Sequence, residues 1–129
     1  MTVLLDTCTL LWWTMDPEQL SAKAAAACRK IEHSVGYVSA VSIWELGIKI
    51  KNQKLSIGMS IERYAELLTK ISGLIILPVD LPEWIRSISL DWAHKDPADR
   101  LIVATAELHD LHLVSNDKIM VSFYPRCIV

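Results

Sequence analysis

The apolar residues of this chain fall into two patterns that alternate along its length. Short, nearly continuous apolar runs are typical of strands that are buried on both faces, because such strands have no face that needs polar residues. These runs predict four strands and a candidate fifth, at residues 2–5, 36–39, 74–77, 112–115 and 127–129. Strands of this kind separated by helices indicate an α/β fold, a three-layer sandwich in which helices cover both faces of a short, mainly parallel sheet of four to five strands.

Between the strands, apolar residues recur at the three- and four-residue spacing of helices. We expect helices over residues 7–14, 21–33, 41–51, 60–72, 82–92 and 96–110. Ser21 stands at an N-cap position. Asp96, Pro97 and Asp99 give an N-cap, a proline at the first helical position and an acid at the third. Gly73 suits the position just after a helix end.

The composition limits the class of protein. The chain has 129 residues, of which 52% are hydrophobic, which is enough to fill the core of one domain over residues 1–129. No apolar stretch approaches the roughly 20 residues of a membrane span. No basic segment precedes the first apolar run, as it would in a secretory signal. The cysteines are scattered and lack Cys-x-x-Cys spacing, so we expect a cytoplasmic protein with reduced thiols and no membrane contact.

The charge balance provides no general attraction for nucleic acids. The formal net charge is −2 at pH 7, so a polyanionic substrate would need a metal ion or a local basic patch to bind. The candidates for local phosphate contacts are Arg100, Lys49, Lys51 and Lys118. A solvated charge is the simpler interpretation of each of them.

Four carboxylates stand where apolar segments meet polar turns. Asp6 follows the first strand, and Asp117 follows the fourth. Glu45 lies inside an apolar helix, and Asp99 opens another. Because the carboxyl ends of parallel strands meet at one edge of a sheet, Asp6 and Asp117 should lie there; Asp99 can reach this edge, and Glu45 must point toward it. Carboxylates in apolar surroundings need a cation, and hard oxygen ligands favour Mg²⁺ or Mn²⁺ over zinc.

Each acid also has an ordinary structural interpretation. Asp6 can cap the helix that follows it. Asp117 can pair with Lys118, the next residue. Glu45 can pair with Lys49, four residues along the same helix. Asp96 is best explained by helix capping, with Asp99 as its capping-box partner, and this role is compatible with a metal site. A single cap or ion pair would not explain why four acids occur at such positions.

Other catalytic motifs are absent from the sequence. The chain lacks a glycine-rich phosphate loop, a Gly-x-Ser-x-Gly elbow and the second aspartate that a dehalogenase-type phosphatase carries two residues after the first. Its histidines show no His-Glu-x-x-His spacing, so we expect solvated or helix-capping roles for His33, His94, His109 and His112. No combination of nucleophile and histidine therefore competes with a metal site.

The segments that carry the four acids together resemble the PIN-domain family, and in particular the VapC-type toxins of bacterial type II toxin–antitoxin systems. The resemblance covers essentially the whole chain and rests on residues 4–7, 41–46, 94–106 and 113–117. The most specific part is the pattern His-x-Asp-Pro-x-Asp-Arg followed by an apolar helix. The chain departs mildly from the pattern of the family at two positions: Ala98 stands where aromatic residues are frequent, and Asn116 precedes the last acid.

The resemblance implies an endoribonuclease that hydrolyses RNA at an acidic quartet holding one or two Mg²⁺ or Mn²⁺ ions: Asp6, Glu45, Asp99 and Asp117. Asp96 would be a secondary acid at the edge of the site. Thr7 and Ser115 would hold the acids or water, with Arg100 as a further supporting residue. Two alternatives remain: a DNA-directed or structure-specific nuclease of the same fold, and a catalytically idle module that only binds a partner.

The resemblance also implies protein partners. They are a cognate antitoxin and a second copy of the chain, in a homodimer or a toxin–antitoxin hetero-oligomer. Trp12 and Trp13 cannot both face inward from one helix, so we expect the antitoxin to cover a groove beside one of them. For a dimer, the sequence itself offers only its surplus of apolar residues.

Overall fold

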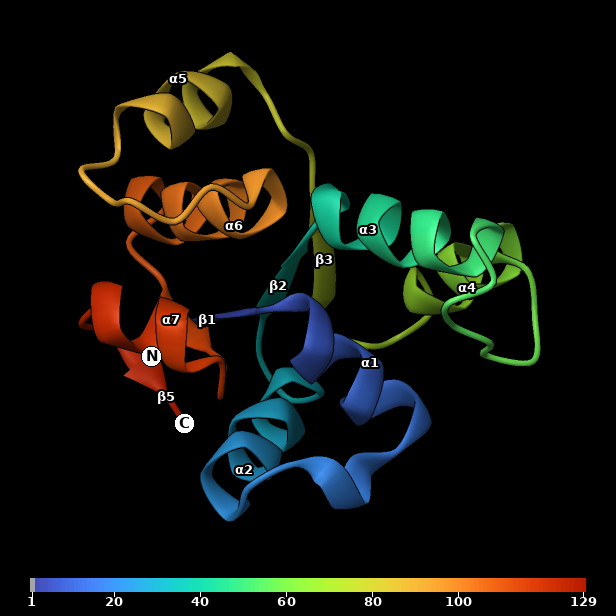
Figure 1. Ribbon diagram of the computed structural model, residues 1–129. Helices are drawn as coiled ribbons and strands as arrows, with labels where there is room; N and C mark the ends of the chain where they lie inside the picture. The colour runs from blue at the N-terminus through green and yellow to red at the C-terminus, as the bar shows by residue number, and fades with distance from the viewer. Residues whose placement is uncertain (1) are drawn as a thin grey trace.

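The computed structural model describes residues 2–129, and its centre is one sheet of five parallel strands (Figure 1). The strands are β1 (Val3–Leu5), β2 (Gly36–Ser39), β3 (Leu74–Leu77), β4 (His112–Val114) and β5 (Cys127–Ile128). Their order across the sheet is β3-β2-β1-β4-β5, so the first strand of the chain is the central one. The predicted α/β fold class is confirmed, and so is the fifth strand.

The central strand fixes the position of the carboxyl edge of the sheet. All three residues of β1 are buried, and they pack alternately into two apolar clusters, one on each face of the sheet. Leu5 at the end of β1 aligns with Val38 on β2 and with Val114 on β4. The amide of Asp6 then donates to the carbonyl of Val114 at 3.2 Å. Asp6 and Ser115 therefore leave the sheet next to each other.

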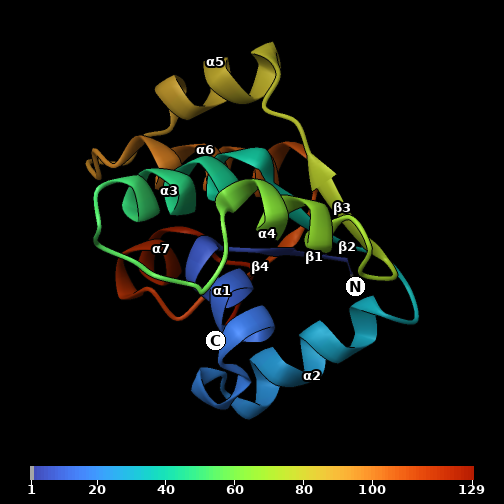
Figure 2. The same cartoon turned by 90° about the vertical axis from the view of Figure 1, so that its right-hand side faces the viewer.

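Helices cover both faces of the sheet. Within residues 2–129 they are α1 (Thr7–Met15), a 3₁₀ turn (Pro17–Gln19), α2 (Ala22–Ile31), α3 (Ala40–Lys51), α4 (Ile61–Leu68), α5 (Leu81–Ser89), α6 (Pro97–Leu108) and α7 (Lys118–Phe123). Helices α1, α2 and α4 share one apolar cluster, whereas α6 and α7 belong to the other. Figure 2 shows α2 and α6 on opposite sides of the sheet, with α5 lying over α6. None of these helices is long and apolar enough to cross a lipid bilayer.

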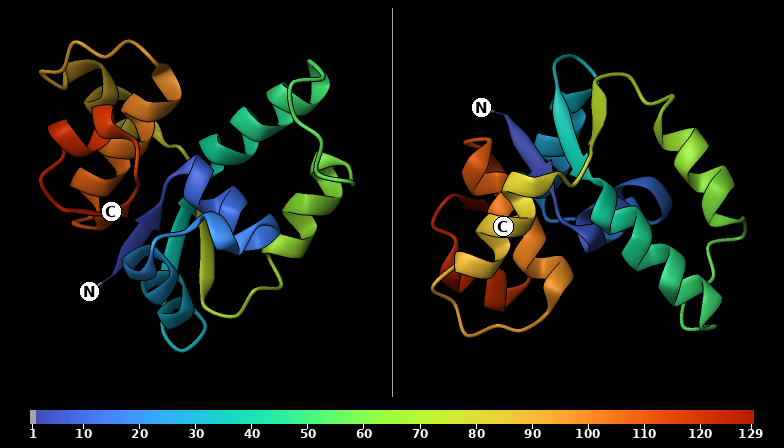
Figure 3. Two further views of the ribbon diagram at one scale, coloured as in Figure 1. Left: turned by 60° about the horizontal axis from the view of Figure 1, so that its bottom comes forward. Right: turned by 90° about the horizontal axis from the view of Figure 1, so that it is seen from above.

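Helix α3 links the two sides of the molecule. Val41 near its start packs into the cluster of α6, and Leu46 packs into the cluster of α1 and α2. Helices α3 and α4 extend together beyond the sheet (Figure 3). Tyr64 and Leu68 of α4 are buried in the same cluster as Leu46. This packing holds α3 against α1, so a side chain on α3 can reach the carboxyl edge.

The structure differs from the sequence-based prediction at four elements. Helix α4 ends at Leu68 rather than near residue 72, because the chain turns there toward Gly73, whose φ is 81°. Helix α5 ends at Ser89 rather than at residue 92, because Leu90 has an extended ψ of 127°. The 3₁₀ turn and α7 were not predicted. With six residues, α7 is too short for its apolar residues to reveal a helical period.

Candidate functional site

Asp6 lies at the centre of the candidate site. It is only 2% exposed, and it caps α1 because its Oδ1 accepts the amide of Thr9 at 2.8 Å. Burial raises the pKa of Asp6, while hydrogen bonds from Ser115 and Thr9 oppose this effect and the charge of Asp117 adds to it. Asp6 thus has the cap role expected from its position, and it is also a buried acid beside a second carboxylate.

Glu45 is brought to the site by a hydroxyl on α1. The Thr7 hydroxyl donates to Glu45 Oε1 at 2.6 Å, and the Thr7 and Ser42 hydroxyl oxygens lie 2.9 Å apart. The side chain of Glu45 is 19% exposed, and its Oε2 lies 3.9 Å from the ammonium of Lys49. The surface pairing with Lys49 therefore exists, but only at the limit of ion-pair distance. The shorter contact points Glu45 toward α1.

Asp99 belongs to a small cluster at the start of α6. The Oδ1 atom of Asp96 accepts the amide of Asp99 at 3.1 Å, which confirms the predicted cap. Asp99 Oδ2 lies 2.7 Å from Nε2 of His94. Burial raises the pKa of Asp99 to about 6; the hydrogen bond with His94 lowers it, and the charges of Asp96, Glu45 and Asp117 raise it.

Asp117 occupies the turn between β4 and α7. Its Oδ1 accepts the amides of Ile119 at 2.8 Å and Met120 at 3.4 Å, so it caps α7. The amide of Asp117 donates to the Ser115 hydroxyl at 3.1 Å. The alternative ion pair with Lys118 does not occur among the ion pairs of residues 2–129. Ser115 therefore touches both acids that leave the sheet.

The quartet shares one electrostatic environment. The charge of Asp117 raises the pKa of Asp6, and the charges of Glu45 and Asp117 raise that of Asp99. Such influence falls off with distance, so the four carboxylates lie in one region of the molecule. The more compact set of potential ligand atoms, within 4.8 Å of one another in the described part of the chain, comes from His94, Asp96 and Asp99. The role of the quartet in holding metal stays a prediction.

Arg100 has a different role from the predicted phosphate contact. Its Nε donates to the carbonyl of Ser87 at 2.8 Å. The two Nη atoms donate to the carbonyls of Trp92 (2.5 Å), His94 (2.9 Å), Leu90 (2.9 Å) and Ile88 (3.4 Å). A guanidinium has five N–H donors, and all five face backbone oxygens here. The expectation that Arg100 binds phosphate is therefore wrong. The sequence shows its charge but not the carbonyls that surround it.

Two residues at the site were not identified from the sequence. His94 was interpreted as solvated or capping, yet its ring nitrogen contacts Asp99. Ser42 is fully buried beside Thr7. The position of His94 in the motif with Asp96 and Asp99 was the available signal. For Ser42 the signal is its place in an apolar helix, three residues before Glu45, where a buried hydroxyl needs a partner.

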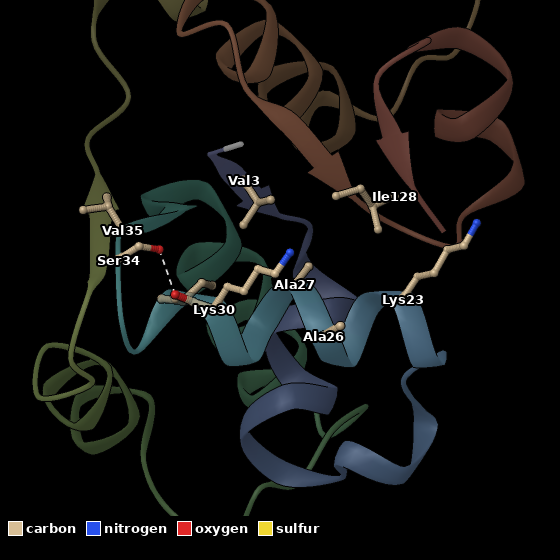
Figure 4. Close-up of a pocket in the computed structure, with 9 residues that line it drawn as sticks. Val3, Lys23, Ala26, Ala27, Lys30, Ser34, Val35 and Ile128 are labelled. Atoms are coloured by element: carbon tan, nitrogen blue, oxygen red, sulfur yellow. Dashed lines mark hydrogen bonds between the residues drawn. The ribbon is translucent and has the colours of Figure 1, made fainter.

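The candidate site does not extend into the cavity shown in Figure 4. That cavity has a volume of about 330 Å³ and lies against α2. Apolar side chains such as Val3, Ala27 and Ile128 line it, with Lys23 and Lys30 among them. Its lining contains no carboxylate and no histidine. The acids at the carboxyl edge therefore do not belong to this cavity.

A parallel α/β sheet with acidic side chains gathered at its carboxyl edge defines the class of protein. Residues 3–124 match the family model of the PIN domain. The chain belongs to the PIN-domain family, which confirms the resemblance seen in its motifs.

Known proteins similar to this chain lead to the same family. Ribonuclease VapC22 from Mycobacterium tuberculosis (strain ATCC 25618 / H37Rv) is 30% identical over 118 residues, which are 91% of this chain and 88% of that protein. A toxin–antitoxin complex from Klebsiella pneumoniae contains a chain with a TM-score of 0.68 and 21% identity, covering 98% of this chain and 96% of that chain. VapBC2 from Rickettsia felis, bound to a promoter DNA fragment, gives a TM-score of 0.69 at 16% identity, covering 99% and 96%. These structures confirm the fold.

Proposed function

We propose that this protein is a metal-dependent endoribonuclease and the toxin of a toxin–antitoxin pair. The observation that best supports this function is the burial of Asp6, which is 2% exposed and forms no ion pair within residues 2–129. A buried carboxylate without a cationic partner is costly. Membership of the PIN family and the 30% identity to a protein named a ribonuclease support the same chemistry.

The side chains at the carboxyl edge fit a divalent metal ion. Their donors are carboxylate oxygens, which Mg²⁺ and Mn²⁺ prefer. We propose that Asp6 and Asp99 hold one or two such ions, supported by Glu45 and Asp117, with Asp96 at the periphery. When bound, the ion supplies a Lewis acid that activates water and stabilises the charge that develops on the phosphate.

The chain's own polar groups hold these acids in place. Glu45 has one oxygen bonded to Thr7, Asp99 has one bonded to His94, and Asp117 has one bonded to the amides that begin α7. The second oxygen of each carboxylate accepts no hydrogen bond within the described residues. The second oxygens of Asp99 and Asp117 are therefore available to a metal ion or to a water molecule that attacks the phosphate, whereas that of Glu45 lies 3.9 Å from the ammonium of Lys49.

The choice of nucleophile determines the product ends. Attack by water on the phosphorus atom breaks the bond to the 3′ oxygen and leaves a 5′-phosphate and a 3′-hydroxyl. Attack by the ribose 2′-hydroxyl would instead leave a cyclic phosphate. We expect attack by water, with a 5′-phosphate and a 3′-hydroxyl as products. The sequence contains no nucleophile–histidine pair that could activate the ribose hydroxyl instead. Analysis of the ends of cleaved RNA distinguishes the two.

Cleavage assays with matched RNA and DNA oligonucleotides test the proposal. The purified protein should cut RNA in Mg²⁺ or Mn²⁺, and EDTA should stop it. Asp6→Asn and Asp99→Asn should lose activity, whereas Glu18→Gln, at an exposed acid on the 3₁₀ turn, should keep it. Undiminished cleavage in EDTA would refute the metal mechanism. Preferential cleavage of DNA would favour the alternative nuclease, and no cleavage of either would favour the idle module.

Bacterial growth provides a test of the toxin role. Expression of the chain alone should arrest growth, and Asp6→Asn or Asp99→Asn should relieve the arrest. The exposed-acid variant Glu18→Gln should remain toxic. Equal toxicity of wild type and both site variants would indicate that growth arrest does not depend on the proposed nuclease site.

Two cavities on α1 support an antitoxin partner. Trp13 lines a cavity of about 320 Å³ with Met59, Tyr64 and Leu68, between α1 and α4. Trp12 lines a second cavity of about 240 Å³, which includes Ser115 at the candidate site. Apolar grooves of this kind accept an amphipathic helix. The product of the reading frame immediately upstream should co-purify with the chain, and Trp13→Ala should weaken that association.

An exposed apolar face on α5 and α3 supports a homodimer. Leu81, Trp84, Ile85 and Ile88 recur at helical spacing and are 49–77% exposed, although such a stripe normally faces a core. Trp84 and Trp44 of α3 line one cavity of about 540 Å³. Trp44 is 58% exposed, so it adds to this face, and a standard interface needs roughly 800 Å² from each partner.

Light scattering after size-exclusion chromatography tests the dimer. We expect the wild-type chain to elute as a dimer and Ile88→Glu as a monomer. Leu108→Glu, a substitution at an exposed residue outside this face, should not change the mass. A monomeric wild type would reject the homodimer.

The single-domain organisation over residues 1–129 and the cytoplasmic location stay predictions.

A further inference from the structure

His94 contacts Asp99 through a well-defined hydrogen bond. Its Nε2 lies 2.7 Å from Asp99 Oδ2, and the two side chains are 20% and 15% exposed. An ionised carboxylate only accepts hydrogen bonds, so the imidazole is the donor when Asp99 is ionised. The ring of His94 lies beside that of Trp92, with the centroids 4.9 Å apart. The imidazole is therefore held between an aromatic ring and the acid.

The segment that carries His94 has no regular structure of its own. It follows the end of α5 and precedes α6. Arg100 donates to five carbonyls of residues 87–94, including that of His94 itself at 2.9 Å. Hydrogen bonds to a charged group are stronger than neutral ones, so these contacts fix the path of the segment. Arg100 is also the residue directly after Asp99, so one turn of α6 carries both the acid and the group that holds its donor.

We propose that Arg100 and His94 are positioning residues for the metal ligand Asp99. Arg100 holds residues 87–94 so that His94 donates to Oδ2, and this bond fixes the carboxylate and would leave Oδ1 for an ion. The torsion that rotates an aspartate carboxylate is broad, so the acid has no fixed orientation without such a donor. The inference rests on the proposed function, because it assumes that Asp99 binds metal.

The rival interpretation makes His94 a metal ligand. His94, Asp96 and Asp99 offer ligand atoms within 4.8 Å of one another, and imidazole would shift the preference toward transition metals. The geometry favours the positioning role, because Nε2 already lies at hydrogen-bond distance from Asp99. A ligand role would require this bond to break.

Titration of the purified full-length protein with Mn²⁺, followed by electron paramagnetic resonance, tests the proposal. His94→Ala should weaken Mn²⁺ binding about 10- to 100-fold, the range found when outer-shell partners of ligands are removed. His94→Gln should bind nearly as well as wild type, because its amide places a donor near the Nε2 position. His109→Ala is the matched control: it removes another histidine–carboxylate contact, made by the residue that caps the opposite end of α6, to Glu83 of α5 at 3.1 Å, and should leave Mn²⁺ affinity unchanged.

The Mn²⁺ spectrum separates positioning from ligation. Electron spin echo modulation should show no directly coordinated nitrogen in the wild type. A directly bound nitrogen that disappears in His94→Ala would overturn the positioning role, and so would equal weakening in His94→Gln and His94→Ala. Unchanged affinity in His94→Ala would also overturn it. If the wild type itself failed to bind Mn²⁺, the proposed function would fail instead, so the two failures are distinguishable.

A double-mutant cycle tests the part played by Arg100. Arg100→Lys keeps the charge but cannot reach five carbonyls, so it should lower Mn²⁺ affinity in the same direction as His94→Ala. If Arg100 acts through His94, the double variant should bind no more weakly than His94→Ala alone. Additive losses would show that Arg100 acts by another route. Circular dichroism checks that each variant folds. If Arg100→Lys does not fold, the His94 variants still decide whether His94 positions Asp99.

Discussion

The Thr7 hydroxyl and Glu45 Oε1 lie 2.6 Å apart, although 38 positions separate the two residues in the sequence. This contact joins the first turn of α1 to the middle of α3. Asp6 immediately precedes Thr7, so the chain presents a buried acid and the donor for a second acid on consecutive residues. A short motif after β1 therefore organises two members of the quartet.

Removal of the Thr7 hydroxyl should disturb the site more than the fold. Thr7→Val keeps the shape of the side chain but leaves Glu45 without its donor. We expect RNA cleavage to fall about tenfold, as for other residues that orient metal ligands, and stability to change by about 1 kcal/mol. Cleavage kinetics and thermal melts measure both effects. Thr7→Ser keeps the hydroxyl and should retain most activity; an equal loss in both variants would contradict this role for the hydroxyl.

Neutralisation of Asp6 should not destabilise the metal-free protein. Asparagine can still accept the amide of Thr9 as an N-cap, while the charge that is buried beside Asp117 disappears. We expect Asp6→Asn to be as stable as wild type or more stable, by ~0.5–2 kcal/mol. Added Mg²⁺ should raise the melting temperature of the wild type more than that of the variant. A variant that loses stability and keeps the full Mg²⁺ shift would exclude Asp6 as a ligand.

The stability of the metal-free protein should depend on the protonation of Asp99. Its pKa is raised from 3.8 to about 6, chiefly by burial. The protonated acid therefore favours the folded state: this contribution is complete below pH 3.8 and is lost as the pH rises through about 6. Urea unfolding in EDTA between pH 4 and pH 7 should show declining stability over this window. Asp99→Asn should make the profile flatter, and identical profiles would contradict the raised pKa.

Gly73 should tolerate substitution less well than Gly58. Both have positive φ, 81° and 75°, so alanine at either position carries a backbone cost of about 1–2 kcal/mol. A Cβ at Gly73 would also lie 1.9 Å from the carbonyl oxygen of Ile31, whereas nothing lies within 4 Å at Gly58. Gly73→Ala should therefore lower the melting temperature more than Gly58→Ala. Equal shifts would show that the chain relaxes around residue 73 without cost.

The main elements of the fold could be predicted because their signals are local. The strands are short apolar runs, and β1 is buried along its whole length. The start of α6 was predictable from Asp96 and Pro97, whose cap and first-turn roles the structure confirms. Helix α7 was missed, because its six residues carry too little pattern. Short elements of this kind are defined by packing, here through the buried Met120.

The arrangement of the site was less accessible from the sequence. The positions of Asp6 and Asp117 at strand ends predicted that they would be close, and the charge of Asp117 indeed raises the pKa of Asp6. Arg100 was misinterpreted, because three of the five carbonyls that surround it come from the loop after α5, whose residues have no periodic pattern. His94 was missed for the same reason. Loop conformation depends on contacts across the fold rather than on propensity, so these two roles required the structure.

The central place of β1 has a consequence for protein synthesis. The ribosome releases the amino end first, so Asp6 emerges before β4 and Asp117 have been made. Until they emerge, β1 has β2 on one side and lacks its other neighbour. A chain that ends before residue 117 cannot bring the four acids together. The strand order therefore means that the proposed site is incomplete in every nascent chain until Asp117 has been made.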